Sequence, residues 1–157
     1  MTDGGRGGRR LAAVIAVLAF LHLMLRPIVS DWYASPNLLV CAALLGARQL
    51  RPGAAAGLGF LLGVLEDAMR VSNFGVSTLL LVLIGYLSSV TRDLFLGEET
   101  LFMGTYLFLG TWLYEVVGYL VAGGGPGALA YVFLRAPLTA LMTGAIGYLV
   151  IPLSGSR

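Results

Sequence analysis

Six apolar segments, separated by short polar breaks, constrain this chain more than any other feature of the sequence. With 58% hydrophobic and 11% charged residues, the chain has too little polar surface to coat a soluble core. Apolar runs of this kind are typical of helices that cross a lipid bilayer. We therefore predict an all-α integral membrane protein, a six-helix transmembrane bundle. The expected helices cover residues 10–29, 37–50, 54–69, 76–91, 101–122 and 128–152.

The domain organisation is simple, because the breaks between the segments are too short to fold alone. Residues 11–152 are predicted to form a single membrane domain, between a disordered cytoplasmic arm over residues 1–10 and a cytoplasmic tail over residues 153–157. The first segment is also similar to a signal peptide, but no small-x-small cleavage site follows it, and His22 and Arg26 interrupt its end. We interpret it as a retained first helix, with His22 as a polar residue near the membrane surface.

Two of the expected helices, residues 37–50 and 54–69, are shorter than the roughly 20 residues that a perpendicular span needs. They could form a re-entrant hairpin, but that would place Arg48 and Arg51 in mid-membrane, where charge is costly. We prefer two short spans. Cytoplasmic termini then satisfy the positive-inside bias. The cytoplasmic set is Arg6, Arg9, Arg10, Arg48, Arg51, Arg92 and Arg157, and the opposite set is Arg26, Arg70 and Arg135.

Residue counts exclude several kinds of site. One Cys and one His leave no Cys/His metal cluster, and without any Lys there is no P-loop. The scattered Arg residues and a net charge of +2 give no support for nucleic-acid binding. Asp67 and Glu115 could in principle serve an aspartyl-protease mechanism, but no motif around them argues for it. We therefore expect no catalytic residue, metal or cofactor, and a protein that is not an enzyme.

The glycine-rich stretch 53–75 predicts close helix packing. Gly53 and Gly57 are four residues apart, as are Gly59 and Gly63, so each pair shares one face of a helix. Small residues at that spacing let helix backbones approach closely in membranes. We expect Gly57, Gly59 and Gly63 to pack against another helix of the bundle or against a partner.

Two adjacent acids follow these glycines. A helix wheel places Glu66 on the face of Gly59 and Gly63, and Asp67 one step round. Two interpretations remain open. Either the acids belong to a functional face, or Glu66 and Asp67 only mark the end of a helix at the membrane surface.

Glu115 and Arg135 lie inside apolar segments, where charge is costly and marks a functional site or a buried pair. Both are about two turns from the GGGPG turn at residues 123–127, so we expect them at similar depth on adjacent helices. We predict that they form an ion pair, whose role could also be limited to fixing helix register. The face that carries Glu115 also contains Thr111, Gly118 and Ala122, and the face that carries Arg135 also contains Thr139 and Thr143.

One set of residues in the chain resembles the MreD family of rod shape-determining membrane proteins. The set is Pro36-Asn37-Leu38, Gly57-x-Gly59-Phe60 with Gly63, Asp67, Gly75 and Gly85-Tyr86-Leu87. The resemblance is clear over residues 36–90 and extends to the remainder by length and helix count. Asp67 and Glu115 stand where members of the family carry acids. The chain departs from the family in its last helix, which lacks the Asn that members often have.

The resemblance implies a non-enzymatic scaffold of the bacterial cell-elongation machinery in the inner membrane. It implies MreC as the main partner, with the actin-like MreB, the glycosyltransferase RodA and its penicillin-binding transpeptidase as further ones, and a fold similar to the substrate-binding subunit of energy-coupling-factor transporters. An alternative of another class is a small-molecule-binding subunit of a transporter. A vitamin-sized polar cavity that opens outward would favour the alternative, whereas a filled interior would favour the scaffold.

Overall fold

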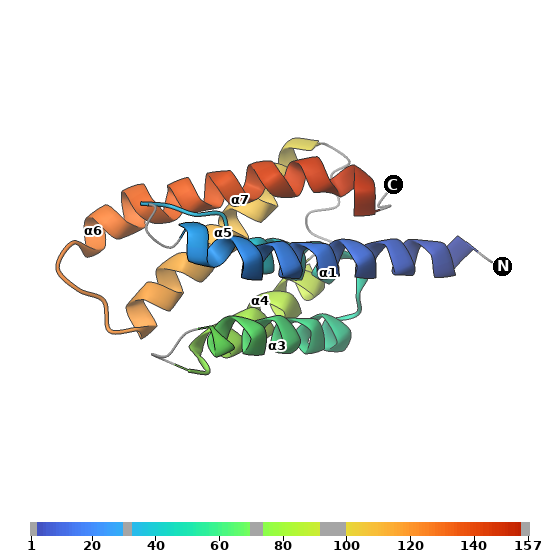
Figure 1. Cartoon of the computed structure of the whole chain (residues 1–157), viewed down its shortest axis with the longest axis horizontal. Helices are drawn as coiled ribbons and strands as arrows, with labels where there is room; N and C mark the ends of the chain where they lie inside the picture. The colour runs from blue at the N-terminus through green and yellow to red at the C-terminus, as the bar shows by residue number, and fades with distance from the viewer. Residues whose placement is uncertain (1–2, 30–32, 70–73, 92–99, 155–157) are drawn as a thin grey trace.

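The computed structural model describes residues 3–29, 33–69, 74–91 and 100–154, and the regular elements within these ranges are helices. The chain runs back and forth along one axis, and both termini lie at the same end (Figure 1). The longer helices are α1 (Asp3–Val29), α2 (Leu38–Gln49), α3 (Pro52–Ala68), α4 (Val76–Thr91), α5 (Thr100–Val121) and α7 (Ala136–Val150). The shorter ones are α6 (Ala128–Ala130), the π-helix η2 (Tyr131–Arg135) and the 3-10 turn η3 (Ile151–Ser154).

The central helix of the bundle is α2. Its side chains from Leu38 to Ala47 are all buried, and it contacts α1, α3, α4, α5 and α7. Leu39, Val40 and Leu44 are 0% exposed. Because protein rather than lipid surrounds α2, its 12 residues need not match the thickness of the hydrocarbon layer.

The hairpin of α3 and α4 is packed backbone to backbone. A Cβ atom on Gly59 would collide with the Leu81 carbonyl, and one on Gly63 with the Thr78 backbone. From the other side, a Cβ on Gly85 would lie 2.6 Å from the Ala55 carbonyl oxygen. The predicted close packing of Gly59 and Gly63 is therefore confirmed, and the helix they contact belongs to the bundle itself.

The helix α6–η2–α7 is continuous but contains a π-helical turn. In that turn the Ala136 N–H donates to the Tyr131 carbonyl, five residues back. The Val132 carbonyl would by the same pattern accept from residue 137, but that residue is Pro137, which has no N–H. Trp112 of α5 supplies the missing donor, with its Nε1 3.1 Å from the Val132 oxygen. A proline and a tryptophan together thus stabilise the π-helix.

Two helices within the described ranges are long and apolar enough to cross a membrane, over Gly7–Ile28 and Ala128–Val150. The helices Leu38–Gln49 and Val76–Thr91 are apolar but shorter. The predicted helix over residues 76–91 coincides with α4, and those over 37–50, 54–69 and 101–122 differ from α2, α3 and α5 by two residues or fewer at each end. Six complete spans remain a prediction.

The beginning of the chain differs from the expected disordered arm over residues 1–10. Helix α1 already begins at Asp3. The segment is rich in Gly, which weakens a helix, but it contains no Pro to stop one, so the helix of the apolar segment extends through it. Residues 1–2 of that arm, 155–157 of the expected tail, and Arg70 and Arg92 lie outside the described ranges.

Candidate functional site

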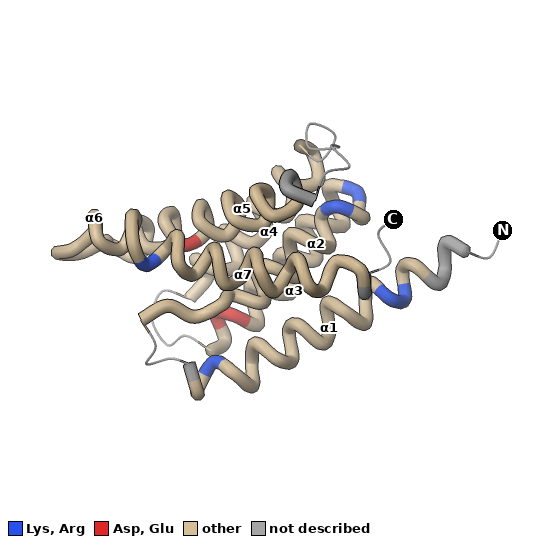
Figure 2. The backbone as a smooth tube through the Cα atoms, turned by 90° about the horizontal axis from the view of Figure 1, so that it is seen from above, with Lys and Arg blue, Asp and Glu red and all other residues tan. Residues whose placement is uncertain are grey.

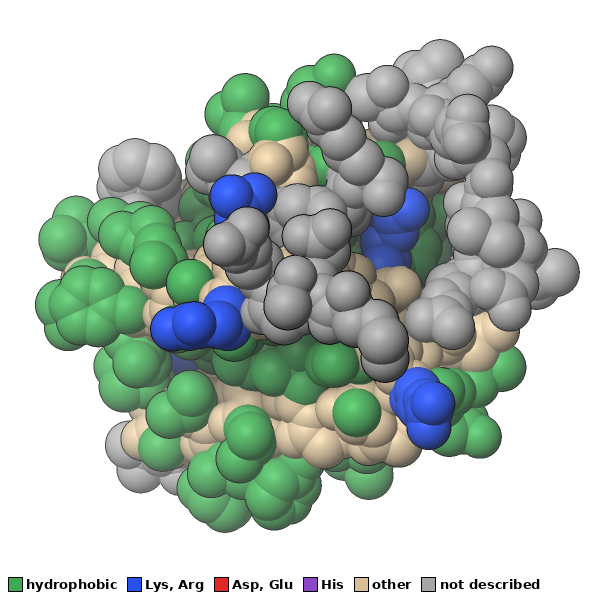
Figure 3. All heavy atoms as spheres, turned by 90° about the vertical axis from the view of Figure 1, so that its right-hand side faces the viewer, with side chains coloured by type: hydrophobic (Ala, Val, Ile, Leu, Met, Phe, Trp, Pro, Cys, Tyr) green, Lys and Arg blue, Asp and Glu red, His purple; other side chains and the backbone are tan. Residues whose placement is uncertain are grey.

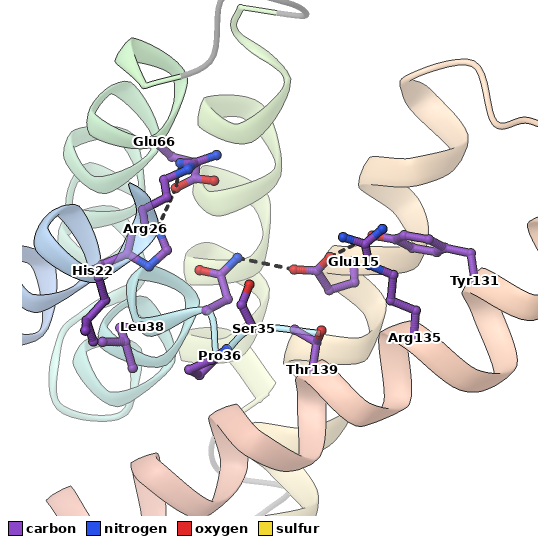
Figure 4. Close-up of a pocket in the computed structure, with 12 residues that line it drawn as sticks. His22, Arg26, Ser35, Pro36, Leu38, Glu66, Glu115, Tyr131, Arg135 and Thr139 are labelled. Carbon is purple, nitrogen blue, oxygen red and sulfur yellow. Dashed lines mark hydrogen bonds and ion pairs between the residues drawn. The ribbon is translucent and has the colours of Figure 1, made fainter. Parts of the chain in front are cut away.

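A polar cavity lies at the end of the bundle opposite the termini. Its volume is about 260 Å³. Figure 2 shows acidic positions on α3 and α5 and basic positions on α1 and just after α6 towards this end. The lining residues, most of them labelled in Figure 4, are His22, Leu25, Arg26, Ser35, Pro36, Asn37, Leu38, Glu66, Glu115, Tyr131, Arg135 and Thr139. Segments from both halves of the sequence therefore meet here.

Asn37 connects three helices at the floor of this cavity. Its Oδ1 accepts from the Val40 N–H at 3.2 Å, which caps the N-terminus of α2. Its own N–H donates to Thr143 Oγ1 of α7 at 2.9 Å, and its Nδ2 donates to Glu115 Oε1 of α5 at 3.3 Å. Asn37 is 6% exposed, so these bonds lie largely out of solvent. The residue fixes where α2 begins relative to α5 and α7.

Glu66 forms a buried charge cluster with α1. Its carboxylate is 1% exposed, and its Oε2 lies 2.7 Å from Arg26 Nη1 and 2.9 Å from His22 Nε2. The Arg26 contact is held by charge rather than by an aligned hydrogen bond. An ionised carboxylate only accepts hydrogen bonds, so opposite an ionised Glu66 the Nε2 of His22 carries a hydrogen. The cluster ties α1 to α3 at the cavity.

His22 and Arg26 were missed as site residues by sequence reasoning, which placed His22 at the membrane surface. His22 is buried, with 8% exposure. A signal was present: His22 and Arg26 are four residues apart, so they share one face of a helix. Their partner Glu66 is 44 positions from His22 along the chain, and its location opposite them depends on how α1 and α3 pack.

Glu115 and Arg135 line the same cavity. The predicted ion pair between them is wrong, because the ion pairs that the described residues form in this cavity belong to Glu66. Tyr131 intervenes. Its hydroxyl donates to Glu115 Oε2 at 2.8 Å, and the Arg135 guanidinium lies 5.6 Å from the centre of its ring. Tyr131 is held by stacking on Tyr119, with ring centroids 4.1 Å apart. The π-helix places Tyr131 and Arg135 here, and the sequence analysis missed both it and Tyr131.

The threonines of the faces predicted around these two charges point inward as expected, whereas Gly118 is only partly buried and Ala122 is exposed. Thr111 and Thr143 are fully buried, and Thr139 is 5% exposed. Thr143 Oγ1 donates to the Thr139 carbonyl while it accepts from Asn37. The small polar side chains let α5 and α7 pack around the N-terminus of α2.

Asp67 joins α3 to α4. Its carboxylate accepts from the N–H groups of Gly75, Ser77 and Thr78 at 2.9 to 3.1 Å, and from Thr78 Oγ1 at 2.6 Å. These donors surround the start of α4, where a negative charge also complements the helix dipole. Gly75 has a φ of 98°, a left-handed conformation that favours Gly. The acid next to the glycine face is therefore a structural cap, and it is 0% exposed.

The helix-wheel assignment of the two acids is corrected by this geometry. Asp67 faces α4, the helix that Gly59 and Gly63 contact, whereas Glu66 faces α1. Positions three and four residues after Gly63 both border its face, so the packing of α1 and α4 decides between them. A Cβ on Gly57 would meet nothing within 4 Å, so this glycine packs against no helix of the described bundle, and a partner role for it stays a prediction. Tyr86 of the family motif is 47% exposed on α4, and nothing in the structure explains why a tyrosine stands at this position.

Comparison with known families is decisive. The model of the family described as rod shape-determining protein MreD matches residues 9–154, nearly the whole chain. The chain belongs to the MreD family. It is therefore a membrane protein with a role in the determination of rod shape.

The MreD resemblance noted in the sequence now has a structural basis. The residue Asn37 caps α2, Asp67 and Gly75 join α3 to α4, and Gly59 and Gly85 bring those helices into contact. Neither a curated protein nor a solved structure matches the chain. Similarity of this MreD-family chain to the substrate-binding subunit of energy-coupling-factor transporters thus remains a prediction.

Proposed function

We propose that this chain is a non-enzymatic scaffold of the cell-elongation machinery in the bacterial inner membrane. It binds MreC and links it to the peptidoglycan synthases, with both termini in the cytoplasm. MreB, RodA and the penicillin-binding transpeptidase are further candidate partners. Membership of the MreD family supplies the role in rod shape, and the partners are the part that we propose.

The observation that carries the scaffold proposal is the filled interior. The central helix α2 is buried along almost its whole length, and α3 and α4 meet without space for a single Cβ atom at Gly59 or Gly63. What the bundle offers a partner is therefore its outer helix faces and its polar end. Large apolar side chains such as Leu61, Leu79 and Leu141, each about 60% exposed or more, cover those faces.

Basic residues at the end of the bundle opposite the cavity support the proposed orientation, in which both termini are cytoplasmic. Figure 2 shows basic positions early in α1 and at the end of α2, on the side of the bundle that carries the termini. The Arg residues of those segments are Arg9, Arg10, Arg48 and Arg51. Figure 3 shows Arg side chains spread over this face, with apolar side chains along the visible flanks. Basic residues gather on the cytoplasmic side of membrane proteins, so the polar cavity faces outward in this proposal.

Site-specific photocrosslinking in cells tests the scaffold function. A photoreactive residue is placed at exposed positions on four helices, Leu61, Leu87, Leu113 and Leu141, and at the buried Leu39 as a matched control. We expect MreC to be captured from one contiguous face and not from the control position Leu39. Variants that restore rod shape but capture MreC from none of the four exposed positions would contradict the proposal.

The cavity is the observation that favours the alternative, a small-molecule-binding subunit. It is polar, as such a site requires, but about 260 Å³ is below the range of roughly 300–1,000 Å³ that is typical of ligand pockets. A vitamin-sized ligand is therefore disfavoured in this cavity. Thermal unfolding of the purified protein with a panel of water-soluble vitamins checks this, since the scaffold proposal expects no shift and the alternative expects one.

A further inference from the structure

The charges that line the cavity fall into two groups. Glu66 forms an ion pair with Arg26 and a hydrogen bond with His22. Glu115 instead accepts from two neutral donors, Asn37 and Tyr131, and the Arg135 contact that the structure shows is with an aromatic ring. A carboxylate offers about four acceptor sites and a guanidinium five donors. Both groups therefore retain capacity for a ligand of the opposite charge.

The cavity size limits that ligand. The cavity volume of about 260 Å³ is below the roughly 300–1,000 Å³ that is typical of pockets for drug-sized ligands. A phosphate joined to an ethanolamine is smaller than such ligands, whereas a nucleotide is not. The ligand should carry a cationic and an anionic group close together, because Glu115 and Arg135 contact opposite parts of one tyrosine side chain.

The position of the cavity mouth indicates where the ligand comes from. Arg135 is exposed and Leu25 is 38% exposed, so the lining opens between α1 and η2. Helix α1 contacts η3 near the termini, and α1 and α7 diverge towards the cavity (Figure 2). The two elements that flank the opening carry exposed apolar side chains, Ile28 on α1 and Phe133 on η2, with 68% and 69% exposure. A polar cavity with an apolar, lateral rim suits a lipid headgroup whose acyl chains stay outside.

We propose that the cavity binds the headgroup of a zwitterionic phospholipid with a primary ammonium group. The ammonium donates to Glu115, and the phosphate accepts from the guanidinium of Arg135, a pairing that allows two parallel hydrogen bonds. The ammonium of a phosphatidylethanolamine fits this description, whereas a quaternary ammonium has no N–H to donate. The proposal goes beyond the scaffold function and does not depend on it.

Native mass spectrometry of the full chain in detergent tests the proposal. Phosphatidylethanolamine, phosphatidylglycerol and phosphatidylcholine of one short acyl length are titrated separately, together with free O-phosphoethanolamine. We expect phosphatidylethanolamine to bind about tenfold more tightly than phosphatidylglycerol, as for one charge-assisted hydrogen bond. Glu115→Gln should abolish that preference, and Arg135→Gln should weaken binding of both lipids. Arg51→Gln, an exposed Arg at the opposite end, is the matched control and should change neither.

Two results overturn the proposal. Equal affinity of the unaltered protein for the three lipids means that no headgroup is recognised. Binding of free O-phosphoethanolamine as tight as that of the lipid assigns the cavity to a soluble ligand instead. Both are measured on the unaltered protein, so they decide the matter even if a variant fails to fold. A preference that survives Glu115→Gln in a folded variant rejects the assigned role of Glu115.

Discussion

Asn37 shows how much of this fold depends on single polar atoms. Its side-chain oxygen caps α2, its side-chain nitrogen binds Glu115, and its backbone N–H binds Thr143. Replacement by Asp keeps the shape and the cap, because Asp caps helices as well as Asn does. The nitrogen that faces Glu115 becomes an oxygen. An Asn37→Asp substitution thus isolates a single contact in the site.

We expect Asn37→Asp to lower the free energy of unfolding by about 1–3 kcal/mol, because it removes a donor and sets two carboxyl groups against each other. Thermal unfolding in detergent, followed by tryptophan fluorescence, measures this. In a Glu115→Gln background the same substitution should cost much less. Equal cost in both backgrounds would mean that the Asn37–Glu115 hydrogen bond contributes nothing.

Two double-mutant cycles distinguish the ion pairs of the cavity. Glu66→Gln and Arg26→Gln should each destabilise the protein, by about 1–3 kcal/mol, because each leaves a charge without its partner. The double variant should recover part of the loss. In the matched cycle, Glu115→Gln with Arg135→Gln, the recovery should be clearly smaller, since the two do not pair directly and share only Tyr131. Additivity in the first cycle, or an equally large recovery in the second, measured by thermal unfolding, would contradict the geometry.

The sequence revealed some of these residues and concealed others for a physical reason. Glu115 was recognisable because a carboxylate among apolar neighbours is costly wherever the helix packs. The partner of a charge depends instead on which helix lies opposite. Glu66 could have been paired with any cation at its depth, and Tyr131 could be seen to intervene between Glu115 and Arg135 only once the π-helix was known.

Among the elements, the α3–α4 hairpin gives the sharpest prediction. Gly63→Ala should destabilise the protein by about 1–3 kcal/mol, because its methyl group would overlap the Thr78 backbone. Gly57→Ala is the matched control on the same helix, where a Cβ meets open space. It should be neutral or stabilise by up to about 1 kcal/mol through helix propensity. Thermal unfolding in one detergent compares them, and similar losses for the two variants would show that the close contact is absent.

Helix positions were predictable and helix geometry was not. Apolar periodicity and the Gly and Pro punctuation placed α2 to α5 to within two residues, because these signals are local. The π-helix depends on Pro137 together with Trp112, 25 positions earlier, so no local pattern announces it. The extension of α1 to Asp3 likewise runs against the local composition.

For the whole molecule, the alternation of the helices makes a prediction about sidedness. On a Cys41→Ala background, a Cys at Gly125 in the turn before α6 should react with an impermeant thiol reagent added outside intact spheroplasts. A Cys at Gly53, at the end that carries the termini, should react only after the membrane is opened. Both positions are exposed and neither glycine has a positive φ. The reverse pattern would invert the proposed orientation.

The enclosure of α2 has a consequence for biogenesis. The ribosome delivers helices in chain order, so α2 leaves the insertion machinery when only α1 precedes it, and α5 and α7, which later contact it, do not yet exist. At that stage Asn37 has neither Glu115 nor Thr143 as a partner. Helix α2 therefore reaches its packed position in the bundle only after synthesis of the last helix. Nascent chains that stop after α4 should be substrates for membrane quality-control proteases.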